Sequence, residues 1–407
     1  MNDKALPPSP LGRLRVLDLA SLFPAPLLAA MLGDYGAEVI KVEPPEGDPL
    51  RGIGVMRDGK SLSWAAAGRN KRSVTLNLAD ARARPLLHRL AQSADVLIEN
   101  FPRDAARRFG VEYEQLRAVN PRLIVATLSC YGVSGPYAER GGNGTLSEAY
   151  AGLTNMTGEA DGPPMLSSVA LGDGLAAIHG LSGILAALYA RDAADPGRDE
   201  TAGLGQHVDL TIYEPVLQLM IMSVARYGAG DAGERRCGSR LPGAAPRNVY
   251  AARDGWVVIS ALTDRVVKRL LEVMGRATPE DLARFGNNAA RAANADALDR
   301  AVAEWVATQP RDRVVELLAE ARIPVTPVND MAAVFADPHI LARGNLARLA
   351  DPELGELTLP APSPRLSATP ARFQGPAPAL GAHNAEVYGA LGFDAAQLRE
   401  LRAAKVI

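Results

Sequence analysis

The chain has 407 residues and a formal net charge of -2, because 44 basic residues nearly balance 46 acidic ones. This balance excludes the basic stripe by which proteins bind nucleic acid. The N-terminus lacks the apolar segment of a signal peptide, and no uninterrupted apolar run is long enough to span a bilayer, so we expect a cytoplasmic protein without a membrane partner.

The first half of the chain alternates short apolar strands with helical segments. Strands are predicted at 14–19, 38–43, 73–78, 95–99, 123–129 and 207–212. Helices are predicted at 24–35, 81–93, around 113–119, and at 171–190 and 214–227. Helical crossovers between successive strands imply parallel pairing. The predicted fold class is therefore α/β, with a doubly wound, mostly parallel sheet in a large domain.

The pattern changes after residue 227. The dipeptide Asp254-Gly255 joins two apolar runs and predicts a β-hairpin over 248–260. Helices are expected at 265–274, 297–308 and 312–321. We therefore predict a large domain over 1–227, completed by 333–407, and a smaller α+β domain over 228–332. Residues 333–380 are expected to form a linker, proline-rich from 360 onward, that returns to the large domain, where helices at 384–391 and 394–404 close the chain.

The first strand–helix turn invites comparison with a dinucleotide site. Glu43 ends the second strand, where an acid that binds ribose would lie. The turn over 19–26 reads LASLFPAP and contains no glycine, so a pyrophosphate could not approach its backbone as the glycine fingerprint allows. The sequence therefore argues against nicotinamide or flavin binding.

Other familiar chemical sites are also missing from the sequence pattern. The five histidines have no ligand-like spacing, and there is no G-x-S-x-G elbow and no P-loop. The two cysteines, Cys130 and Cys237, are far apart and are expected to be separate thiols. We expect no metal and no permanently bound cofactor.

The most informative stretch is SSVALGDG at 167–174, which places Asp173 between two glycines at the start of an apolar helix. In one interpretation Asp173 is an N-cap, a position where aspartate is favoured. In the other it is a nucleophile, and the backbone N–H groups of Gly172 and Gly174 hold a developing oxyanion. The residues alone leave both interpretations open.

Short motifs recur in a fixed order along the chain. They are LRVLD at 14–18, GAEVIKVE at 36–43, NKRS at 70–73, ENF at 99–101, TGEADGPP at 157–164, GILAAL at 183–188 and PALGAH at 378–383. In this order and spacing the chain resembles the family III CoA-transferases, which include formyl-CoA and carnitine CoA-transferases and the related α-methylacyl-CoA racemases. The resemblance covers nearly the whole chain.

The resemblance implies that Asp173 is the catalytic nucleophile, since it follows the 157–164 segment and opens a long helix as the family's aspartate does. It also implies a set of residues that contact CoA. These are Leu76, Asn100, Phe101 and Arg108, with Lys71 and Arg72 as further candidates for its phosphates. Without the resemblance, we would predict that Phe101 is a core residue and that Arg108 is an ordinary exposed arginine on a helix.

Two departures from the family narrow the function. Where the racemases carry a histidine followed by an acid, this chain has Gly142, Asn143 and Gly144, and Asn143 cannot act as a base. The segment 238–243, GSRLPG, lacks the glycine run of the formyl-CoA transferases, so oxalate is not the expected acceptor.

The predicted function is transfer of CoA from an acyl-CoA donor to a carboxylic acid, through an aspartyl anhydride and an aspartyl–CoA thioester. The alternatives are an α-methylacyl-CoA racemase on the same fold and a non-catalytic CoA-binding protein. The predicted partners are CoA thioesters, carboxylic acids and a second copy of the chain, because the resemblance implies an interlocked homodimer.

Overall fold

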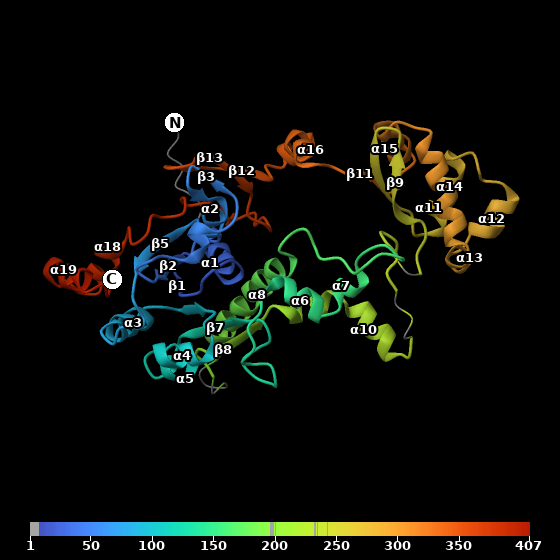
Figure 1. Cartoon of the computed structure of the whole chain (residues 1–407). Helices are drawn as coiled ribbons and strands as arrows, with labels where there is room; N and C mark the ends of the chain where they lie inside the picture. The colour runs from blue at the N-terminus through green and yellow to red at the C-terminus, as the bar shows by residue number, and fades with distance from the viewer. Residues whose placement is uncertain (1–7, 196–198, 200, 232, 234, 242) are drawn as a thin grey trace. The chain divides into compact units, whose positions relative to one another are not determined.

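The computed structural model describes residues 8–407 except 196–198, 200, 232, 234 and 242. The described chain forms two compact units, which are labelled by element in Figure 1. The first unit consists of the described part of Met1–Ala151 together with Ser167–Ile221 and Ala342–Ile407. The second consists of Gly152–Leu166 and Met222–Leu341. The segment Gly152–Leu166 thus belongs to the second unit, and no feature of the sequence signalled this.

A six-stranded sheet runs through the first unit. Its strands are β1 (Arg15–Asp18), β2 (Glu38–Glu43), β5 (Lys71–Thr75), β6 (Val96–Glu99), β7 (Ile124–Ser129) and β8 (His207–Thr211). Their order is β5-β2-β1-β6-β7-β8, and every neighbouring pair is parallel. The prediction of an α/β fold with a large parallel sheet is confirmed. The strand order reverses between β1 and β6, which is where open α/β sheets bind their ligands.

Helices cover both faces of this sheet. Alternate residues of a strand point to opposite faces, and Val16 joins one core while Leu17 joins the other. The core of Val16 is completed by α1 (Pro24–Asp34) and α8 (Leu171–Ala193). The core of Leu17 is completed mainly by α3 (Ala83–Gln92), α18 (Asn384–Ala390) and α19 (Ala395–Ala403). Burial on both faces explains why the strands read as continuous apolar runs.

The long helix α8 has the length and composition of a membrane span, a property that core helices of globular proteins share. It packs against α1, β7, β8 and two further helices, α6 (Gly144–Tyr150) and α9 (Tyr213–Leu219). The prediction of a buried helix holds for only one side of it. On the other side Ile178 is 51% exposed and Tyr189 is 76% exposed.

The boundaries of several elements differ from the prediction. The predicted strand over 73–78 is β5, which has already ended when the chain reaches Leu76. The predicted helix over 214–227 is two helices, α9 and α10 (Ile221–Gly228), because the backbone of Met220 leaves helical geometry with ψ at 20°. Shorter elements of the first unit are η1 (Pro49–Gly52), β3 (Met56–Arg57), β4 (Lys60–Ser61), α2 (Leu62–Ala67), α4 (Arg103–Phe109) and α5 (Tyr113–Arg117).

The second unit is built on a three-stranded antiparallel sheet. The predicted hairpin is present as β9 (Arg247–Ala252) and β10 (Gly255–Ser260), and β11 (Val325–Pro327) pairs with β10. The core of this unit combines β9 and β10 with α11 (Asp264–Val273), α14 (Ala295–Ala307) and α15 (Arg311–Glu320). The second unit also contains α7 (Leu153–Met156), α12 (Pro279–Phe285), α13 (Asn288–Ala293), α16 (Met331–Ala336) and all but the last residue of α17 (Pro338–Ala342).

The segment expected as a linker is more ordered than predicted. It contains α16, α17 and the hairpin of β12 (Leu346–Asp351) and β13 (Gly355–Pro360). Leu357 of the hairpin packs on Ala65 in the first unit. Residues 361–380, all of which the structure describes, contain no helix or strand. They nevertheless form hydrogen bonds with other segments of the first unit. For example, the N–H of Arg372 donates to the carbonyl of Asp34 at 2.9 Å.

Candidate active site

A cavity of about 780 Å³ lies at the carboxyl ends of β6, β7 and β8. This size is within the range of small-molecule sites. Its wall includes Asn100 and Phe101 after β6, Ser129 at the end of β7, Ile212 after β8, and Asp173 from the first turn of α8. The candidate nucleophile and two of the predicted CoA contacts therefore share one cavity within the first unit.

Asp173 is not the N-cap of its own helix. The N-cap of α8 is Ala170, whose side chain has no capping oxygen, and Asp173 is the third helical residue. The Asp173 carboxylate instead accepts a hydrogen bond from the backbone N–H of Gly144, the first residue of α6. The N-cap interpretation of Asp173 is therefore wrong.

The carboxylate lies directly against the backbone of α6. A Cβ atom at Gly144 would lie 2.6 Å from Cγ of Asp173 and 2.7 Å from each of its oxygens. A Cβ atom at Gly172 would lie 2.9 Å from the carbonyl oxygen of Gly144. Two glycines are therefore needed where the helices meet, for close approach of the backbones rather than for unusual dihedral angles.

The expectation that Gly172 and Gly174 offer free N–H groups to an oxyanion is not met. The N–H of Gly172 donates to Oε1 of Glu148 at 3.3 Å, and the N–H of Gly174 donates to the carbonyl of Ala170 at 2.9 Å. Helix formation and Glu148 thus satisfy both donors. Gly174 instead leaves room, because beyond its chain neighbours and the nearby backbone of α8 no described atom lies within 4 Å of the place its Cβ would occupy.

The surroundings of Asp173 raise the pKa of its carboxyl group. Burial is the main cause, and the negative charge of Glu148 adds to it, while the hydrogen bond from Gly144 acts in the opposite direction. Burial favours the neutral acid because the carboxylate loses hydration. A partly desolvated carboxylate that is more basic than usual has the properties of a nucleophile.

Asn143 has a structural role beside this site. It is the N-cap of α6, and its side-chain oxygen accepts the N–H of Leu146 at 3.3 Å. An amide in this position has no basic group for removing an α-proton. The geometry therefore agrees with the sequence argument against racemase chemistry.

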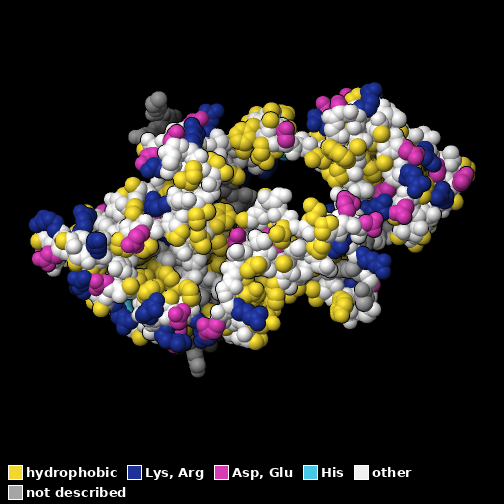
Figure 2. All heavy atoms as spheres, viewed as in Figure 1, with side chains coloured by type: hydrophobic (Ala, Val, Ile, Leu, Met, Phe, Trp, Pro, Cys, Tyr) yellow, Lys and Arg dark blue, Asp and Glu magenta, His cyan; other side chains and the backbone are white. Residues whose placement is uncertain are grey.

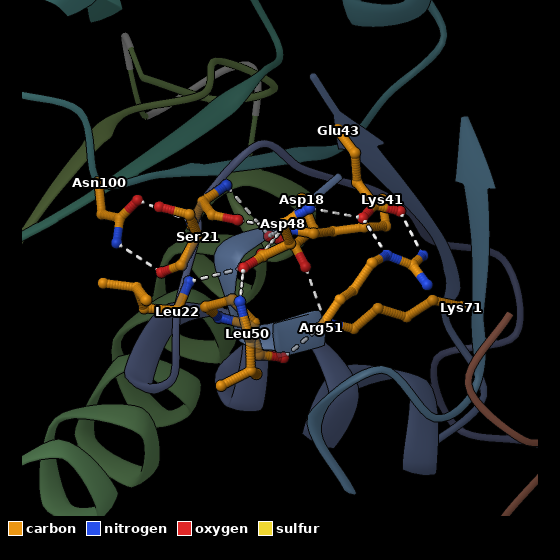
Figure 3. Close-up of polar contacts among 12 residues, drawn as sticks. Asp18, Ser21, Leu22, Lys41, Glu43, Asp48, Leu50, Arg51, Lys71 and Asn100 are labelled. Carbon is orange, nitrogen blue, oxygen red and sulfur yellow. Dashed lines mark hydrogen bonds and ion pairs between the residues drawn. The ribbon is translucent and has the colours of Figure 1, made fainter. Parts of the chain in front are cut away.

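Asn100 connects the two strands at which the sheet order reverses. Its Oδ1 accepts the N–H of Ser21 and its Nδ2 donates to the carbonyl of Ser21, both at 2.9 Å (Figure 3). Asn100 thereby fixes the turn after β1 against the end of β6. Phe101 follows it, and its ring lies edge-on to Phe109 with 5.3 Å between the ring centroids.

The turn after β1 explains why this sheet, whose strand order is that of the dinucleotide-binding fold, lacks the glycine fingerprint. The N–H of Ser21 is taken by Asn100, and that of Ala20 donates to Asp18 at 3.2 Å. The N–H of Leu22, whose φ is 68°, donates to Asp48 at 3.1 Å. Side chains of the protein thus occupy the donors that would hold a pyrophosphate (Figure 3).

Two of the predicted CoA contacts are interior residues. Lys71 is a buried ion whose Nζ lies 2.7 Å from Oδ2 of Asp18 and 2.7 Å from the carbonyl of Pro26. Leu76 is 1% exposed and packs in the core beneath the sheet. Neither side chain is accessible to a phosphate or to CoA, so both predictions are corrected. The NKRS motif could not reveal that its lysine faces inward.

Two predicted arginines lie on the surface outside the cavity. Arg72 on β5 pairs with Glu38 at 2.9 Å and with Glu386 at 3.1 Å. Arg108 is exposed on α4, and it is not among the described residues that line the cavity, although its neighbour Arg107 is. The structure therefore does not bring these two side chains to the site.

Arg140 is a site residue that sequence reasoning missed. Its guanidinium carbon lies 3.7 Å from the ring centroid of Tyr137, a geometry that holds a cation over an aromatic face. The other arginines on the wall, Arg103 and Arg107, pair with Glu139 and Glu112, at 3.6 Å and 3.5 Å. Among the described arginines of the wall, Arg140 alone has no acidic partner. No local motif marks it.

Glu99 is a second missed residue, although it belongs to the ENF motif. It is 2% exposed on the cavity wall, and burial raises its pKa to about 7, helped by the charge of Glu112 and opposed by hydrogen bonds from Thr127 and Phe101. Thr127 in turn contacts Nε2 of His207 at 3.0 Å. Only the structure shows that these side chains meet, because they come from three strands. In the part of the chain that is described, no three acidic, histidine or cysteine side chains group as metal ligands.

Comparison with known proteins assigns the class. The model of CoA-transferase family III matches residues 11–384, so the chain belongs to this family. Succinyl-CoA–D-citramalate CoA-transferase of Chloroflexus aurantiacus is 37% identical over 98% of this chain and 99% of its own length. Acetyl-CoA:oxalate CoA-transferase of Acetobacter aceti is 34% identical over 84% of this chain and 87% of its own length.

The fold comparison agrees. A CaiB/BaiF family protein from Brucella suis, known from its crystal structure, is 32% identical with a TM-score of 0.80, covering 94% of this chain and 99% of its own. The resemblance drawn from the motifs is thereby confirmed, and the chain is a family III CoA-transferase enzyme.

Proposed function

We propose that this enzyme transfers CoA from an acyl-CoA donor to a carboxylic acid through covalent intermediates on Asp173. The observation that carries the proposal is the carboxylate of Asp173 in the wall of the cavity, partly desolvated and beside the open space over Gly174. Family membership supports transfer of CoA itself.

In the first step a carboxylate oxygen of Asp173 attacks the carbonyl carbon of the donor thioester. The C–S bond breaks, CoA leaves as a thiolate, and an aspartyl–acyl anhydride remains. The thiolate then attacks the aspartyl carbonyl, which releases the donor acid as a carboxylate and leaves an aspartyl–CoA thioester. The acceptor carboxylate attacks this thioester, and the same two steps in reverse yield the new acyl-CoA and free Asp173. One thioester replaces another, so no ATP is consumed.

The contact with Gly144 gives the second step its oxyanion donor. When the thiolate attacks the aspartyl carbonyl, negative charge develops on an oxygen of Asp173 itself. The N–H of Gly144 already donates to this carboxylate. A donor fixed in a helix stabilises that charge without reorganisation, which is the usual basis of oxyanion stabilisation.

We propose succinyl-CoA as the donor and a short dicarboxylic acid as the acceptor. The names of two relatives contain the dicarboxylic acids citramalate and oxalate. The guanidinium group of Arg140 lies at the wall of the cavity without an acidic partner in the described part of the chain, and this supports a substrate with a free carboxylate. The test is an assay of succinyl-CoA against a panel of mono- and dicarboxylic acids that includes oxalate. Equal turnover with monocarboxylic acids would count against this choice.

We also propose the interlocked homodimer and a cytoplasmic location. Large apolar side chains lie on the outer face of the first unit, among them Ile178 and Tyr189 of α8 and Leu219 of α9, and Figure 2 shows hydrophobic side chains across its visible surface. Cys130 and Cys237 are free thiols, as is usual in a reducing compartment. Analytical ultracentrifugation that finds a concentration-dependent monomer would contradict the interlocked dimer.

A further inference from the structure

Glu148 is a buried carboxylate beside the candidate nucleophile. It lies on α6 and is 3% exposed. Its oxygens accept the backbone N–H of Gly172 at 3.3 Å and that of Ser167 at 3.4 Å. Over the residues that the structure covers, no lysine, arginine or histidine forms an ion pair with it. A buried carboxylate without a cation is costly, so its position calls for a physical reason.

The position follows from helical geometry. Residues four apart lie on one face of a helix, and side chains lean toward the N-terminus. Glu148 therefore lies over the turn that begins at Gly144, on the side that faces α8. The two helices exchange hydrogen bonds, because Asp173 of α8 accepts the N–H of Gly144 while Glu148 of α6 accepts the N–H of Gly172.

We propose that Glu148 is a positioning residue for Asp173, which fixes the first turn of α8 through the N–H of Gly172 and sets a negative charge beside the nucleophile. This role rests on the function proposed for Asp173. The first N–H groups of a helix have no partner within it, and Ala170 supplies no side-chain oxygen to cap them. A carboxylate also suits the positive end of a helix as long as α8.

The charge of Glu148 affects the reactivity of Asp173 as well as its place. It adds to burial in raising the pKa of the Asp173 carboxyl, and a more basic carboxylate is a stronger nucleophile toward a thioester. The titratable and charged groups on the other elements packed against α8 are Asp34, His207, Asp209, Tyr213 and Glu214, with Cys130 directly after β7. Of the charged side chains, it is Glu148 that shifts the pKa of Asp173.

The test separates charge from hydrogen bonding. Glu148→Gln keeps an oxygen that accepts the N–H of Gly172 but removes the charge. We expect kcat to fall roughly tenfold with KM for the acyl-CoA little changed. We also expect the acidic limb of the kcat/KM profile to move to lower pH, since the pKa of Asp173 falls. An exposed acid provides the matched control: Glu353→Gln, which only loses a surface pair with Lys60, should match the wild type.

A second variant covers the case in which Glu148→Gln does not fold. Glu148→Asp keeps the charge on a shorter side chain, so kcat should fall while the acidic limb stays near its wild-type position. Wild-type kcat and pH profile in Glu148→Gln, or in Glu148→Asp where only that variant folds, would overturn the inference. These outcomes are distinct from failure of the proposed function, which would appear as turnover in Asp173→Asn whatever the residue at position 148.

Discussion

The backbone of Gly144 and the carboxylate of Asp173 are in direct contact, so that a single added methyl group at Gly144 would lie 2.6 Å from the carboxyl carbon. The candidate nucleophile on α8 thus contacts the first residue of α6. One turn later on the same helix, Glu148 adds a negative charge beside this carboxylate.

Replacing Gly144 tests this contact. Gly144→Ala should displace the carboxylate of Asp173 and lower kcat by about 100-fold, as misplacement by about 1 Å does elsewhere. The control is Gly389→Ala on α18, where a Cβ meets no described atom within 4 Å beyond its chain neighbours and the nearby backbone of the helix, and where alanine should stabilise the helix by about 0.5–1 kcal/mol. Steady-state kinetics and thermal unfolding of both variants suffice. Near-normal kcat in Gly144→Ala would contradict the geometry.

The covalent role of Asp173 has a direct readout. Asp173→Asn leaves the fold and CoA binding nearly intact but cannot form an anhydride, so kcat should fall by at least ~10³-fold. Incubation of the wild type with an acyl-CoA donor alone should attach CoA to the peptide that contains Asp173, while Asp173→Asn should carry none. Intact-protein mass spectrometry with peptide mapping measures this. Substantial turnover by the variant would remove Asp173 as nucleophile.

The sequence could predict the sheet better than the site. Strands such as β6 and β7 are mainly apolar on both faces, so their pattern can be recognised locally, and the motif around Asp173 marked the start of a helix. The lining of the cavity depends on packing between distant segments. Nothing in the local pattern distinguishes Lys71, which is buried against Asp18, from Arg72, which is at the surface. The same holds for Arg140, whose importance arises from its contact with Tyr137 and from the pairing of the other arginines.

Two arginine substitutions distinguish the prediction from the sequence, that Arg108 binds CoA, from the prediction from the structure, that Arg140 binds the substrate. Arg140→Gln should raise KM for succinyl-CoA by about tenfold, since the charge-assisted hydrogen bond proposed to its free carboxylate is worth about 1.5 kcal/mol. Arg108→Gln should change KM less than twofold, because its side chain lies outside the described wall of the cavity. Initial-rate measurements over a range of acyl-CoA concentrations decide between them. The reverse ranking would restore Arg108 as the CoA contact.

Glu99 should make stability depend on pH in an unusual direction. Its pKa is about 7 in the folded protein and 4.5 in a free side chain, so the folded state holds its proton more tightly. Its contribution is complete below pH 4.5 and is lost as pH rises through about 7, and it amounts to about 3 kcal/mol. Glu99→Gln should flatten this dependence. Urea unfolding of both proteins between pH 5 and 8 measures it, and parallel curves would show that Glu99 does not titrate there.

The buried ion pairs beneath the turn after β1 allow a test of whether Lys71 is a structural residue or a contact for CoA. Lys71 and Asp18 are fully buried, and Lys41 adds a second cation, 3.7 Å from Asp18 and 2.9 Å from Asp48 (Figure 3). Removing one member of such a pair leaves an uncompensated charge in the interior. Lys71→Met should therefore lower the free energy of unfolding by about 3–5 kcal/mol.

The matched experiment is a double-mutant cycle. Asp18→Asn combined with Lys71→Met should cost less than the sum of the two single substitutions, because the isolated charge is gone. The folded fraction of Lys71→Met should keep a wild-type KM for the acyl-CoA, since the Nζ atom is bound to Asp18 and to the carbonyl of Pro26 rather than exposed to the cavity. A large rise in KM with little loss of stability would mean that Lys71 meets a CoA phosphate after all, as the family motif first suggested. Urea unfolding and initial-rate kinetics on the same preparations distinguish the two outcomes.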